Sequence, residues 1–474
     1  MMTQPNVIHW FNQDLRLLDN PALFDSAKDN HVLAVYILDD LNEPNNSIGQ
    51  TSKVWLHHSL ESLNESMGGK LSFFRGDPLS ILSKLCSKYQ INEIFWNQIY
   101  EPHIIKRDEH IKEQMALQGV ISKTYNASLL WHPDNIKKDD RSPYKVFTPF
   151  YRKGCLVNAP DPRKPLPLPE NIHFLDKDGD SLKVKDLELL PNISWDKKIS
   201  QYWNIGEVAA HVQLSKFLEI GIKDYKEGRN YPAKSYVSKL SPYIHFGEIS
   251  PNQIWYKLKQ LDFNKNIDHF MSELGWREFS YSQLYFNPDL RTKNLQPKFD
   301  RFPWKYDQPN LLAWQKGLTG VPIVDAGMRQ LWQTGYIHNR VRMIVASFLV
   351  KNLLLHWHYG EQWFWDCLVD ADLASNSAGW QWVAGSGADA APYFRIFNPI
   401  TQGQKFDTDG EYVRSYIPEL QKLPNKYLFN PWEAPDFVLQ ESEVFLGVNY
   451  PNPIVNIKES REKALDAFES IKTI

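Results

Sequence analysis

The chain lacks the features that mark several common classes of protein. Its three cysteines, Cys86, Cys155 and Cys367, are widely spaced and odd in number, which argues against a disulfide framework and a cysteine-ligated metal site. No stretch approaches the roughly 20 apolar residues of a membrane-spanning helix. No basic-then-apolar signal pattern opens the sequence either. We therefore expect a reducing compartment and no membrane partner: the cytoplasm, associated with the nucleoid in a bacterium, or the nucleus of a eukaryote.

Two common nucleotide-binding motifs are also missing. The sequence has no Gly-x-Gly-x-x-Gly after its first β-rich run and no Gly-x-x-x-x-Gly-Lys-Ser/Thr anywhere, which argues against a dehydrogenase or a nucleotidase. The net charge of −3 lacks the basic surplus of a typical polyanion binder. Any DNA site must therefore be a local basic patch on a nearly neutral protein.

The sequence does contain an alternation of β-rich and helical segments in its N-terminal part. The β-rich runs are Val7–Phe11, Val32–Leu38, Leu71–Phe74, Glu93–Trp96 and Ile121–Tyr125. Such alternation is typical of a doubly wound parallel sheet with helices on both faces, whereas helical patterns dominate further along the chain. We predict a Rossmann-like α/β domain over residues 1–132, a proline-rich and charged inter-domain connection over residues 133–201, and an all-α domain over residues 202–474.

The segment His338–Trp357 is apolar nearly all round after its first turn, which predicts one helix inside the helical domain. Arg340 and Arg342 stand at its start, and an arginine in such surroundings needs a partner or a ligand. Asp370 or Asp372 could be that partner. Two solvent-facing arginines at a helix end are the alternative.

The most informative segment begins at Asp370 and continues through Asp372, Asn376, Trp380 and Trp382. It sets two acids, an amide and two tryptophans close together among small residues. This combination suits an aromatic cofactor and an aromatic substrate. For each tryptophan alone, core packing would be the default interpretation.

Two further segments carry informative groups. Hydroxyl groups and free backbone amides at Ser238, Leu240 and Ser241, just ahead of an expected helix, are typical of an anion-binding loop, although an ordinary helix N-cap fits them too. Glu273 and Trp276 are three residues apart and therefore share one face of a helix. A flat side chain and a carboxyl group on one face suit a flipped-out base. A core tryptophan beside a surface acid is the alternative.

Together these motifs closely resemble those of the photolyase/cryptochrome family, in the form found in class I cyclobutane pyrimidine dimer photolyases. The resemblance runs from Val7 to about Ala467. It implies a light-driven lyase that repairs pyrimidine dimers in DNA by electron transfer from photoexcited, reduced anionic FAD to a flipped-out dimer. Such an enzyme needs no nicotinamide, metal or nucleophile. We expect it to be a monomer.

The resemblance assigns a flavin site residue by residue. The residues implied to bind FAD are Tyr225, Val237, Ser238, Lys239, Leu240, Ser241, Arg342, Asp370, Ala371, Asp372 and Asn376. Val237 departs from the family's usual threonine, which puts one side-chain hydrogen bond in doubt. Arg342 is implied to pair with Asp370, and Asn376 to face the flavin ring nitrogen that carries the extra proton in the reduced form.

The resemblance also assigns catalytic and DNA-contacting residues. Glu273 and Asn376 are implied to be catalytic, and Trp304, Trp357 and Trp380 to pass electrons from the surface to the flavin. The residues implied to contact the DNA or the lesion are Arg229, Glu273, Trp276, Arg277, Asn339, Arg340, Met343, Trp382 and Arg395. Photolyases for (6-4) photoproducts typically have histidines where Asn339 and Met343 stand, so cyclobutane dimers are the favoured lesion.

A second, light-harvesting chromophore is left open. Tyr100-Glu101 and the segment from Tyr144 to Phe150 resemble family segments near such an antenna. Arg291-Thr292 follow Leu290 where the folate-binding branch tends to have Cys-Lys, which puts a folate in doubt. A deazaflavin, a flavin and an empty site remain.

Two rival functions and a metal site are weighed against this hypothesis. A cryptochrome is disfavoured because plant cryptochromes typically have aspartate, and insect ones cysteine, at the position of Asn376, and because the chain ends at Ile474 without a signalling tail. A flavin-dependent oxidoreductase is disfavoured because no hydride-donor motif occurs. His356 and His358, two apart on an expected helix, should not share a face, so we predict no metal.

Overall fold

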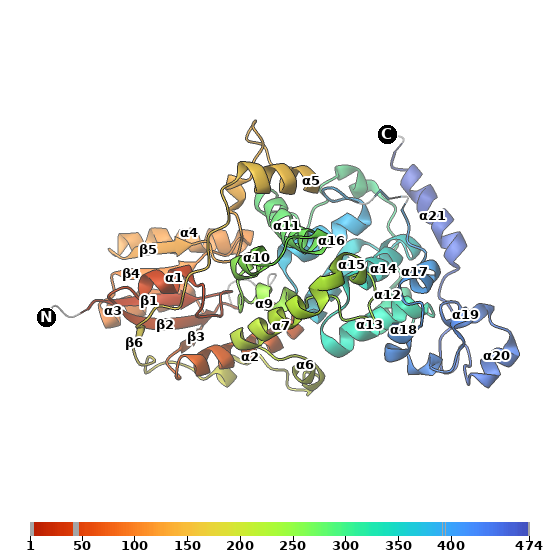
Figure 1. Ribbon diagram of the computed structural model, residues 1–474, viewed down its shortest axis with the longest axis horizontal. Coiled ribbons are helices and arrows are strands. Elements are labelled where there is room, and N and C mark those ends of the chain that lie inside the picture. Colours follow the sequence, from red (N-terminus) through yellow and green to blue (C-terminus); the bar gives the residue numbers. More distant parts are fainter. Residues whose placement is uncertain (1–3, 41–46, 391, 394, 473–474) are drawn as a thin grey trace. The chain divides into compact units, whose positions relative to one another are not determined.

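The computed structural model describes residues 4–40, 47–390, 392–393 and 395–472 (Figure 1). The chain divides into two compact units, and each consists of two stretches of sequence. Unit 1 comprises Met1–Leu218 and Ser238–Pro288, and unit 2 comprises Glu219–Val237 and Asp289–Ile474. These boundaries differ from the predicted ones, because residues from 202 to 218 and from 238 to 288 belong with the N-terminal sheet.

Unit 1 is built around a parallel sheet, as predicted. Its strands are β1 (Asn6–Phe11), β2 (His31–Leu38), β3 (Ser72–Arg75), β4 (Glu93–Asn97) and β5 (Ile121–Tyr125). They lie in the order β3-β2-β1-β4-β5, with Val7 opposite Val32 and Ile8 opposite Ile94. The direction of winding reverses between β1 and β4, which makes the fold doubly wound.

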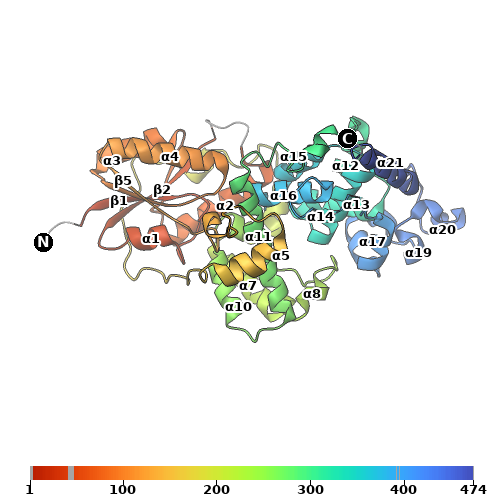
Figure 2. The ribbon, with the colours of Figure 1, turned by 90° about the horizontal axis from the view of Figure 1, so that it is seen from above.

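Both faces of the sheet are buried, because successive side chains along each strand point to opposite faces and helices cover both. Helices α3 (Pro78–Tyr89) and α4 (Pro102–Leu117) cover one face, and α1 (Pro21–Ser26) covers the other (Figure 2). Trp10 and Trp96 point to the first face, whereas their strand neighbour Phe95 packs with residues of α1. This period of two is the pattern expected of strands buried on both sides.

The connection after the sheet carries more structure than its composition predicts. A short strand, β6 (His173–Phe174), adds in parallel to β2, and residues Phe150–Asn158 form a π-helix after α5 (Phe147–Pro149). The remaining helices of unit 1 are α2 (Gln50–Ser66), α6 (Lys197–Tyr202), α7 (Glu207–Glu219), α9 (Ser241–His245), α10 (Pro251–Lys259) and α11 (Lys265–Phe286), with 3-10 turns at Pro133–Asn135 and Val184–Leu187.

Unit 2 is helical, as predicted for the C-terminal part. Its helices are α8 (Tyr225–Gly228), α12 (Gln308–Lys316), α13 (Pro322–Thr334), α14 (Asn339–Ser347), α15 (Trp357–Cys367), α16 (Leu373–Ala384), α17 (Pro399–Phe406), α18 (Glu411–Tyr416), α19 (Asn425–Leu428), α20 (Asp436–Glu441) and α21 (Ile457–Glu469). Four 3-10 turns complete it, at Gly221–Asp224, Pro297–Arg301, Pro418–Leu420 and Pro431–Glu433. No helix in the described parts of the chain is both long and apolar enough to cross a membrane.

The single helix predicted over His338–Trp357 is interrupted. Helix α14 ends at Ser347, a π-helical turn follows over Phe348–Asn352, and α15 begins only at Trp357. Leu354 between them has a φ of 57°, in the left-handed region that an α-helix cannot contain. Apolar periodicity could not reveal this break, since neither proline nor glycine marks it.

Glu248 is a fully buried acid of unit 1 whose burial outweighs the hydrogen bonds that it accepts, and it generates a prediction. The side chain is fully buried, and this burial raises the pKa of Glu248 from 4.5 to about 8. Because the folded pKa is the higher one, the unfolding free energy should fall as the pH rises from about 5 to 8, by up to about 1.4 kcal/mol per pH unit.

We expect Glu248→Gln, which stays neutral, to show a flatter pH dependence of the urea midpoint than the wild type. Glu65→Gln, at an exposed position of α2, is the matched control and should leave the wild-type slope unchanged. Equal slopes for Glu248→Gln and the wild type would contradict the assignment.

Candidate functional site

An ion pair between the half-buried Arg342 and the buried Asp370 connects two segments of unit 2. The Nη2 atom of Arg342 on α14 lies 3.0 and 2.8 Å from the two carboxylate oxygens of Asp370, and its Nε donates to the carbonyl oxygen of Ile337 at 2.7 Å. Asp370 is 8% exposed, so its charge needs this partner. Of the two acids that the sequence offered to Arg342, the structure selects Asp370.

Asp372 has a separate structural role at the start of α16. It is the N-cap residue, and its side chain accepts a hydrogen bond from the backbone N–H of Ser375 at 2.7 Å. Ala371 between the two acids is buried. The segment 370–372 is therefore fixed at one end by an ion pair and at the other by a helix cap.

Asn376 lies one turn into α16 with its amide orientation determined by two acceptors. Its Nδ2 donates to the backbone oxygen and to the carboxylate Oε1 of Glu361, both at 3.1 Å. Both partners can only accept, so the nitrogen must face them and the oxygen Oδ1 is left as an acceptor for another group. This arrangement fits a cofactor that presents an N–H donor, as a reduced flavin ring does.

Glu361 is a residue of the site that sequence reasoning missed. It is 1% exposed on α15, and Arg291 Nε lies 3.4 Å from its carboxylate. Burial raises the pKa of Glu361 above its usual value, against the opposing charge of Arg291. The available signal was an acid within the aromatic sequence of α15, and Arg291 was considered only as a departure from the folate-binding pattern.

The predicted anion loop has a different hydrogen-bonding pattern from the one expected. The backbone N–H of Leu240 is not free, because it donates to the hydroxyl of Ser238 at 3.3 Å. Ser238 in turn accepts from Gln213 through its carbonyl at 2.7 Å, and Ser241 opens the short helix α9 without serving as its N-cap. Part of the expected cradle is thus closed by a local turn.

Other predicted flavin contacts lie near this loop in the sequence. Lys239 has a φ of 52°, and its ammonium group donates to the hydroxyl of Tyr202 at 2.7 Å. Val237 is half-buried, and the buried Tyr225 begins α8 with the guanidinium of Arg229 5.4 Å from its ring centre. The chain passes from unit 2 to unit 1 between Val237 and Ser238, so the predicted FAD residues come from both units.

The three tryptophans of the predicted electron path lie in unit 2 and differ in burial. Trp304 is half-buried, whereas Trp357 and Trp380 are buried. Trp380 packs against α15 one turn after Trp357, at Gly360, where an added Cβ would lie 2.0 Å from the Trp380 ring. Only glycine therefore admits the indole at this place. The electron path itself stays a prediction.

His356 provides an aromatic contact that the sequence interpretation overlooked. Its ring centre lies 5.1 Å from that of Trp304 and 5.6 Å from that of Trp357. Burial lowers the pKa of His356 to about 4, so the ring is neutral at physiological pH. His356 is the N-cap of α15 and not a helical residue, which brings its ring centre to 4.5 Å from that of His358. The argument that the two histidines cannot share a face was therefore wrong.

The predicted lesion contacts form two groups, one in each unit. Glu273 and Trp276 are half-buried on α11, and His269 Nε2 lies 3.8 Å from a carboxylate oxygen of Glu273. Met343 and Trp382 are half-buried on α14 and α16. That the two groups meet at one lesion stays a prediction.

The predicted DNA-contacting arginines have different environments. Burial, and then the charge of Arg229, lowers the pKa of Arg340, whose Nη2 donates to Asn230 Oδ1 at 2.5 Å and whose guanidinium lies over Phe406. Two cations that are close enough for their charges to interact suit an anion. Asn339 beside them is exposed.

Arg277 and Arg395 also have different environments. Arg277 donates to the carbonyl of Ser128 at 2.7 Å and pairs with the buried Glu278, so its side chain is used inside unit 1, which counts against the predicted phosphate contact. Arg395 is exposed, and its carbonyl oxygen accepts from the buried Lys351 at 3.0 Å. Lys351, which was not predicted, thereby holds the loop that carries Arg395.

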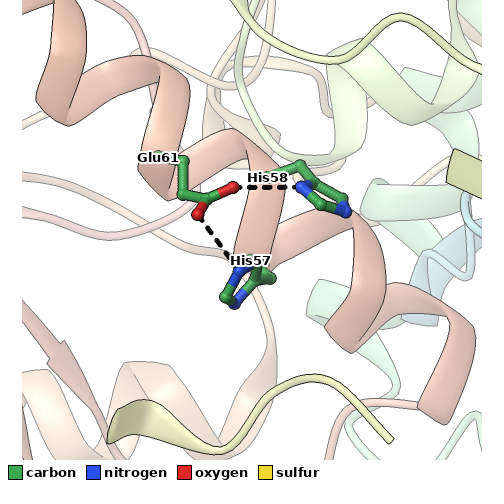
Figure 3. A group of neighbouring side chains, drawn as sticks. All are labelled: His57, His58 and Glu61. Atoms are coloured by element: carbon green, nitrogen blue, oxygen red, sulfur yellow. Dashed lines mark hydrogen bonds and ion pairs between the residues drawn. The ribbon is translucent and has the colours of Figure 1, made fainter. Parts of the chain in front are cut away.

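One cluster of potential metal ligands occurs among the described residues, in unit 1 on α2. The carboxylate of Glu61 lies between two imidazoles, 3.3 Å from His57 Nε2 and 3.1 Å from His58 Nδ1 (Figure 3). Burial lowers the pKa of His57, so a neutral ring that donates to the carboxylate accounts for the arrangement. The prediction of no metal stays a prediction.

Comparisons with known proteins agree with this geometry. Residues 7–170 match the family described as DNA photolyase, and residues 270–470 match the one described as FAD binding domain of DNA photolyase. The chain is 44% identical to the deoxyribodipyrimidine photo-lyase of Agrobacterium fabrum over 98% of both proteins. It is 34% identical to cryptochrome-1 of Arabidopsis thaliana over 98% of this chain and 70% of that protein.

Solved structures extend the comparison. A bacterial class III photolyase from Agrobacterium tumefaciens superposes with a TM-score of 0.95 at 43% identity, covering 100% of this chain and 99% of the other. An archaeal photolyase from Sulfolobus tokodaii, described with two FAD molecules, gives a TM-score of 0.83 at 30% identity over 98% and 100%. The predicted α/β and helical architecture and the FAD cofactor are thereby confirmed. The class I assignment finds no support, because the Agrobacterium structure belongs to class III.

The contact between Glu361 and Asn376 generates a prediction. Glu361→Leu removes the acceptor of the amide side chain and leaves Arg291 without its carboxylate, which should lower the unfolding free energy by about 1–3 kcal/mol. We also expect a lower FAD content after purification, measured as the ratio of flavin to protein absorbance, because the Asn376 amide is no longer oriented. Glu361→Gln keeps a side-chain acceptor and should lose less of both. Wild-type stability and FAD content in Glu361→Leu would show that Glu361 does not position Asn376.

Proposed function

Because this chain belongs to the photolyase/cryptochrome family, we propose that it is a photolyase that splits cyclobutane pyrimidine dimers in DNA with blue light. We place it in class III, after its Agrobacterium relative, and not in class I. The observation that carries the proposal is the Asn376 amide, whose nitrogen is committed to Glu361 and whose oxygen remains an acceptor. A neutral amide accepts a proton donor without adding a charge that would repel electrons from the cofactor.

The proposed reaction requires FAD, and the described residues fit this cofactor. When bound in its reduced anionic form, FAD would supply light-driven one-electron chemistry without a net redox change. Asn376 would accept a hydrogen bond at Oδ1. Arg342, neutralised by Asp370, would contribute a fixed dipole beside the site, and Asp372 would hold the start of α16 in place.

The lesion would be bound by groups from α11 and by the tryptophan and methionine of unit 2. Trp276 would stack on a flipped-out base, and Trp382 and Met343 would supply further flat and apolar surface. Glu273 would offer a carboxyl group to the polar edge of the dimer. The neutral side chains of Asn339 and Met343 support a cyclobutane dimer as the substrate, since neither can transfer a proton as histidine does.

Backbone phosphates would be bound by the cations of unit 2. Arg229 and Arg340 are close enough for their charges to interact, and Arg395 is exposed on a loop anchored by Lys351. Contacts of this kind are independent of sequence and weaken strongly with salt. The enzyme would therefore recognise the lesion by its shape and the DNA by its charge.

A light-harvesting chromophore remains a separate proposal. The Sulfolobus relative, described with two FAD molecules, supports a second flavin, and a deazaflavin or a folate is the alternative. Arg291 and Thr292 stand where the folate-binding branch tends to have Cys-Lys, which supports the flavin or the deazaflavin over the folate.

A blue-light receptor of the cryptochrome type is the second candidate function. It is favoured by the 34% identity to the Arabidopsis protein over nearly the whole chain. The asparagine at position 376 supports repair instead, because the resemblance places aspartate there in plant cryptochromes. Activity on a defined lesion decides between the two.

We expect the purified protein to convert a thymine-dimer oligonucleotide to its undamaged form under blue light and to leave it unchanged in the dark. Chromatography of the oligonucleotide before and after exposure measures the conversion. A (6-4) photoproduct in the same sequence serves as the matched control and should not react. Flavin-loaded protein that repairs neither lesion would favour the receptor function.

A second prediction concerns the proposed electron path. Trp380→Phe should abolish light-driven reduction of oxidised FAD, because phenylalanine is much harder to oxidise than an indole, while leaving repair intact when the FAD has been reduced chemically beforehand. Absorbance spectra follow the reduction, and the oligonucleotide assay follows repair. Trp314→Phe, which changes a neighbouring indole whose ring centre lies 6.1 Å from that of Trp380, tests whether the effect is specific to this position. Loss of repair by the pre-reduced Trp380→Phe protein would reassign Trp380 to structure or substrate contact.

A further inference from the structure

One ring face of Trp276 is already covered within unit 1. The ring of Phe147, in the short helix α5, lies 3.8 Å from the Trp276 ring between centres, with an angle of 11° between the planes. Phe279, one turn further along α11, meets Trp276 edge-on at 5.8 Å and 79°. A flat substrate can therefore stack only on the opposite face of this indole.

A third ring, that of Tyr151, lies beside Phe147. Tyr151 is nearly parallel to Phe147, with ring centres 5.6 Å apart and an angle of 7°. It approaches the backbone of α11 at Gly275, where an added Cβ would lie 2.5 Å from the Tyr151 ring. The glycine next to Trp276 is thus the residue that admits the stack formed by Trp276, Phe147 and Tyr151.

The segment that carries Phe147 and Tyr151 is joined to α11 on both sides of Trp276. Toward the C-terminal end of the helix, Gln283 Nε2 donates to the carbonyl oxygen of Tyr144 at 2.9 Å. Toward its N-terminal end, Arg152 makes two hydrogen bonds to the carboxylate of Asp268, at 2.7 and 2.6 Å. Two attachments on either side of the ring stack leave it little freedom to shift along the helix.

We propose that Phe147, backed by Tyr151, is a positioning residue for dimer recognition. It holds the Trp276 ring in one orientation before the lesion arrives, so that less side-chain freedom is lost when a base stacks on the open face. The inference rests on the proposed function, because it takes Trp276 as the ring that meets the dimer. It adds that recognition depends on a residue from the segment between the sheet and the helices.

A role in packing alone predicts something different from a role in positioning. If Phe147 only fills space, its loss should lower stability and affect damaged and undamaged DNA alike. If it orients Trp276, its loss should weaken binding of the dimer alone and leave the rate at saturating substrate unchanged. The two cases therefore differ in the ratio of affinities and in the split between KM and kcat.

The decisive variant is Phe147→Leu, which keeps apolar bulk but removes the flat ring. We expect its affinity for dimer-containing DNA in the dark to fall about two- to tenfold, the factor corresponding to one aromatic pair, with no comparable loss for undamaged DNA. Phe147→Tyr retains the ring and should bind the dimer nearly as the wild type does. Phe95→Leu, which makes the same change at a buried position in the sheet, is the matched control and should leave the ratio of the two affinities unchanged.

A second measurement does not depend on DNA or on activity. In protein labelled with fluorotryptophan, the resonance of Trp276 can be assigned among the 17 tryptophans by its absence in Trp276→Phe. Phe147→Leu should shift and broaden this resonance by fluorine NMR, whereas Phe95→Leu should not. If Phe147→Leu does not fold, Tyr151→Leu replaces it and should produce a smaller change in the same direction.

The outcomes separate this inference from the proposed function. An unchanged dimer affinity in Phe147→Leu, or equal losses on both kinds of DNA, would overturn the positioning role. An unchanged Trp276 resonance would overturn it as well. If instead the wild type shows no preference for dimer DNA and Trp276→Ala changes nothing, the proposed function fails, whatever the NMR signal of Trp276 shows about the stack.

Discussion

The ion pair between Arg342 and Asp370 is the interaction on which the centre of unit 2 depends. It joins the first turn of α14 to Asp370, two residues before the α16 cap, and the buried Asp370 would be costly to bury without a partner. This pair fixes the position of the start of α16. It thereby also fixes the backbone position of Asn376, which lies one turn later. Glu361 then fixes the rotation of the Asn376 amide from a second helix, α15. The orientation of a single oxygen atom thus depends on three helices.

Much of the fold could be predicted because it follows from periodicity. Strands buried on both faces, such as Val7–Phe11 and Glu93–Trp96, stand out as short apolar runs, and the observed bounds differ by a residue at most. The break before Trp357 could not be predicted, because Leu354 adopts its left-handed conformation without a glycine or proline to signal it. Strand β6 was also missed, since two residues are too few to show a pattern.

In the candidate site, too, residues within a recognisable motif could be predicted, whereas residues that act through long-range contacts could not. Motif resemblance identified Arg342, Asp370 and Asn376, because their types and spacing are distinctive in the sequence. It could not identify Glu361, Lys351 or Phe147, because each acts through a residue distant in the chain, and nothing in its own neighbourhood marks it. Arg277 illustrates the converse, since an arginine that resembles a phosphate contact also contacts Ser128 and Glu278 inside unit 1, and its role in DNA binding stays a prediction. Contacts of long side chains are decided by the fold and not by the local sequence.

The Trp380 ring packs directly against the backbone of Gly360. The indole occupies the volume in which every other amino acid would place its first side-chain carbon, so the contact between α15 and α16 has no tolerance for even one methyl group. Any replacement at this position must push the ring, and with it the turn of α16 that begins near Asn376. A position without a side chain thereby sets the distance between an aromatic ring and its neighbours. Substitutions should therefore be tolerated less well at Gly360, which has no side chain, than at many charged residues of this protein.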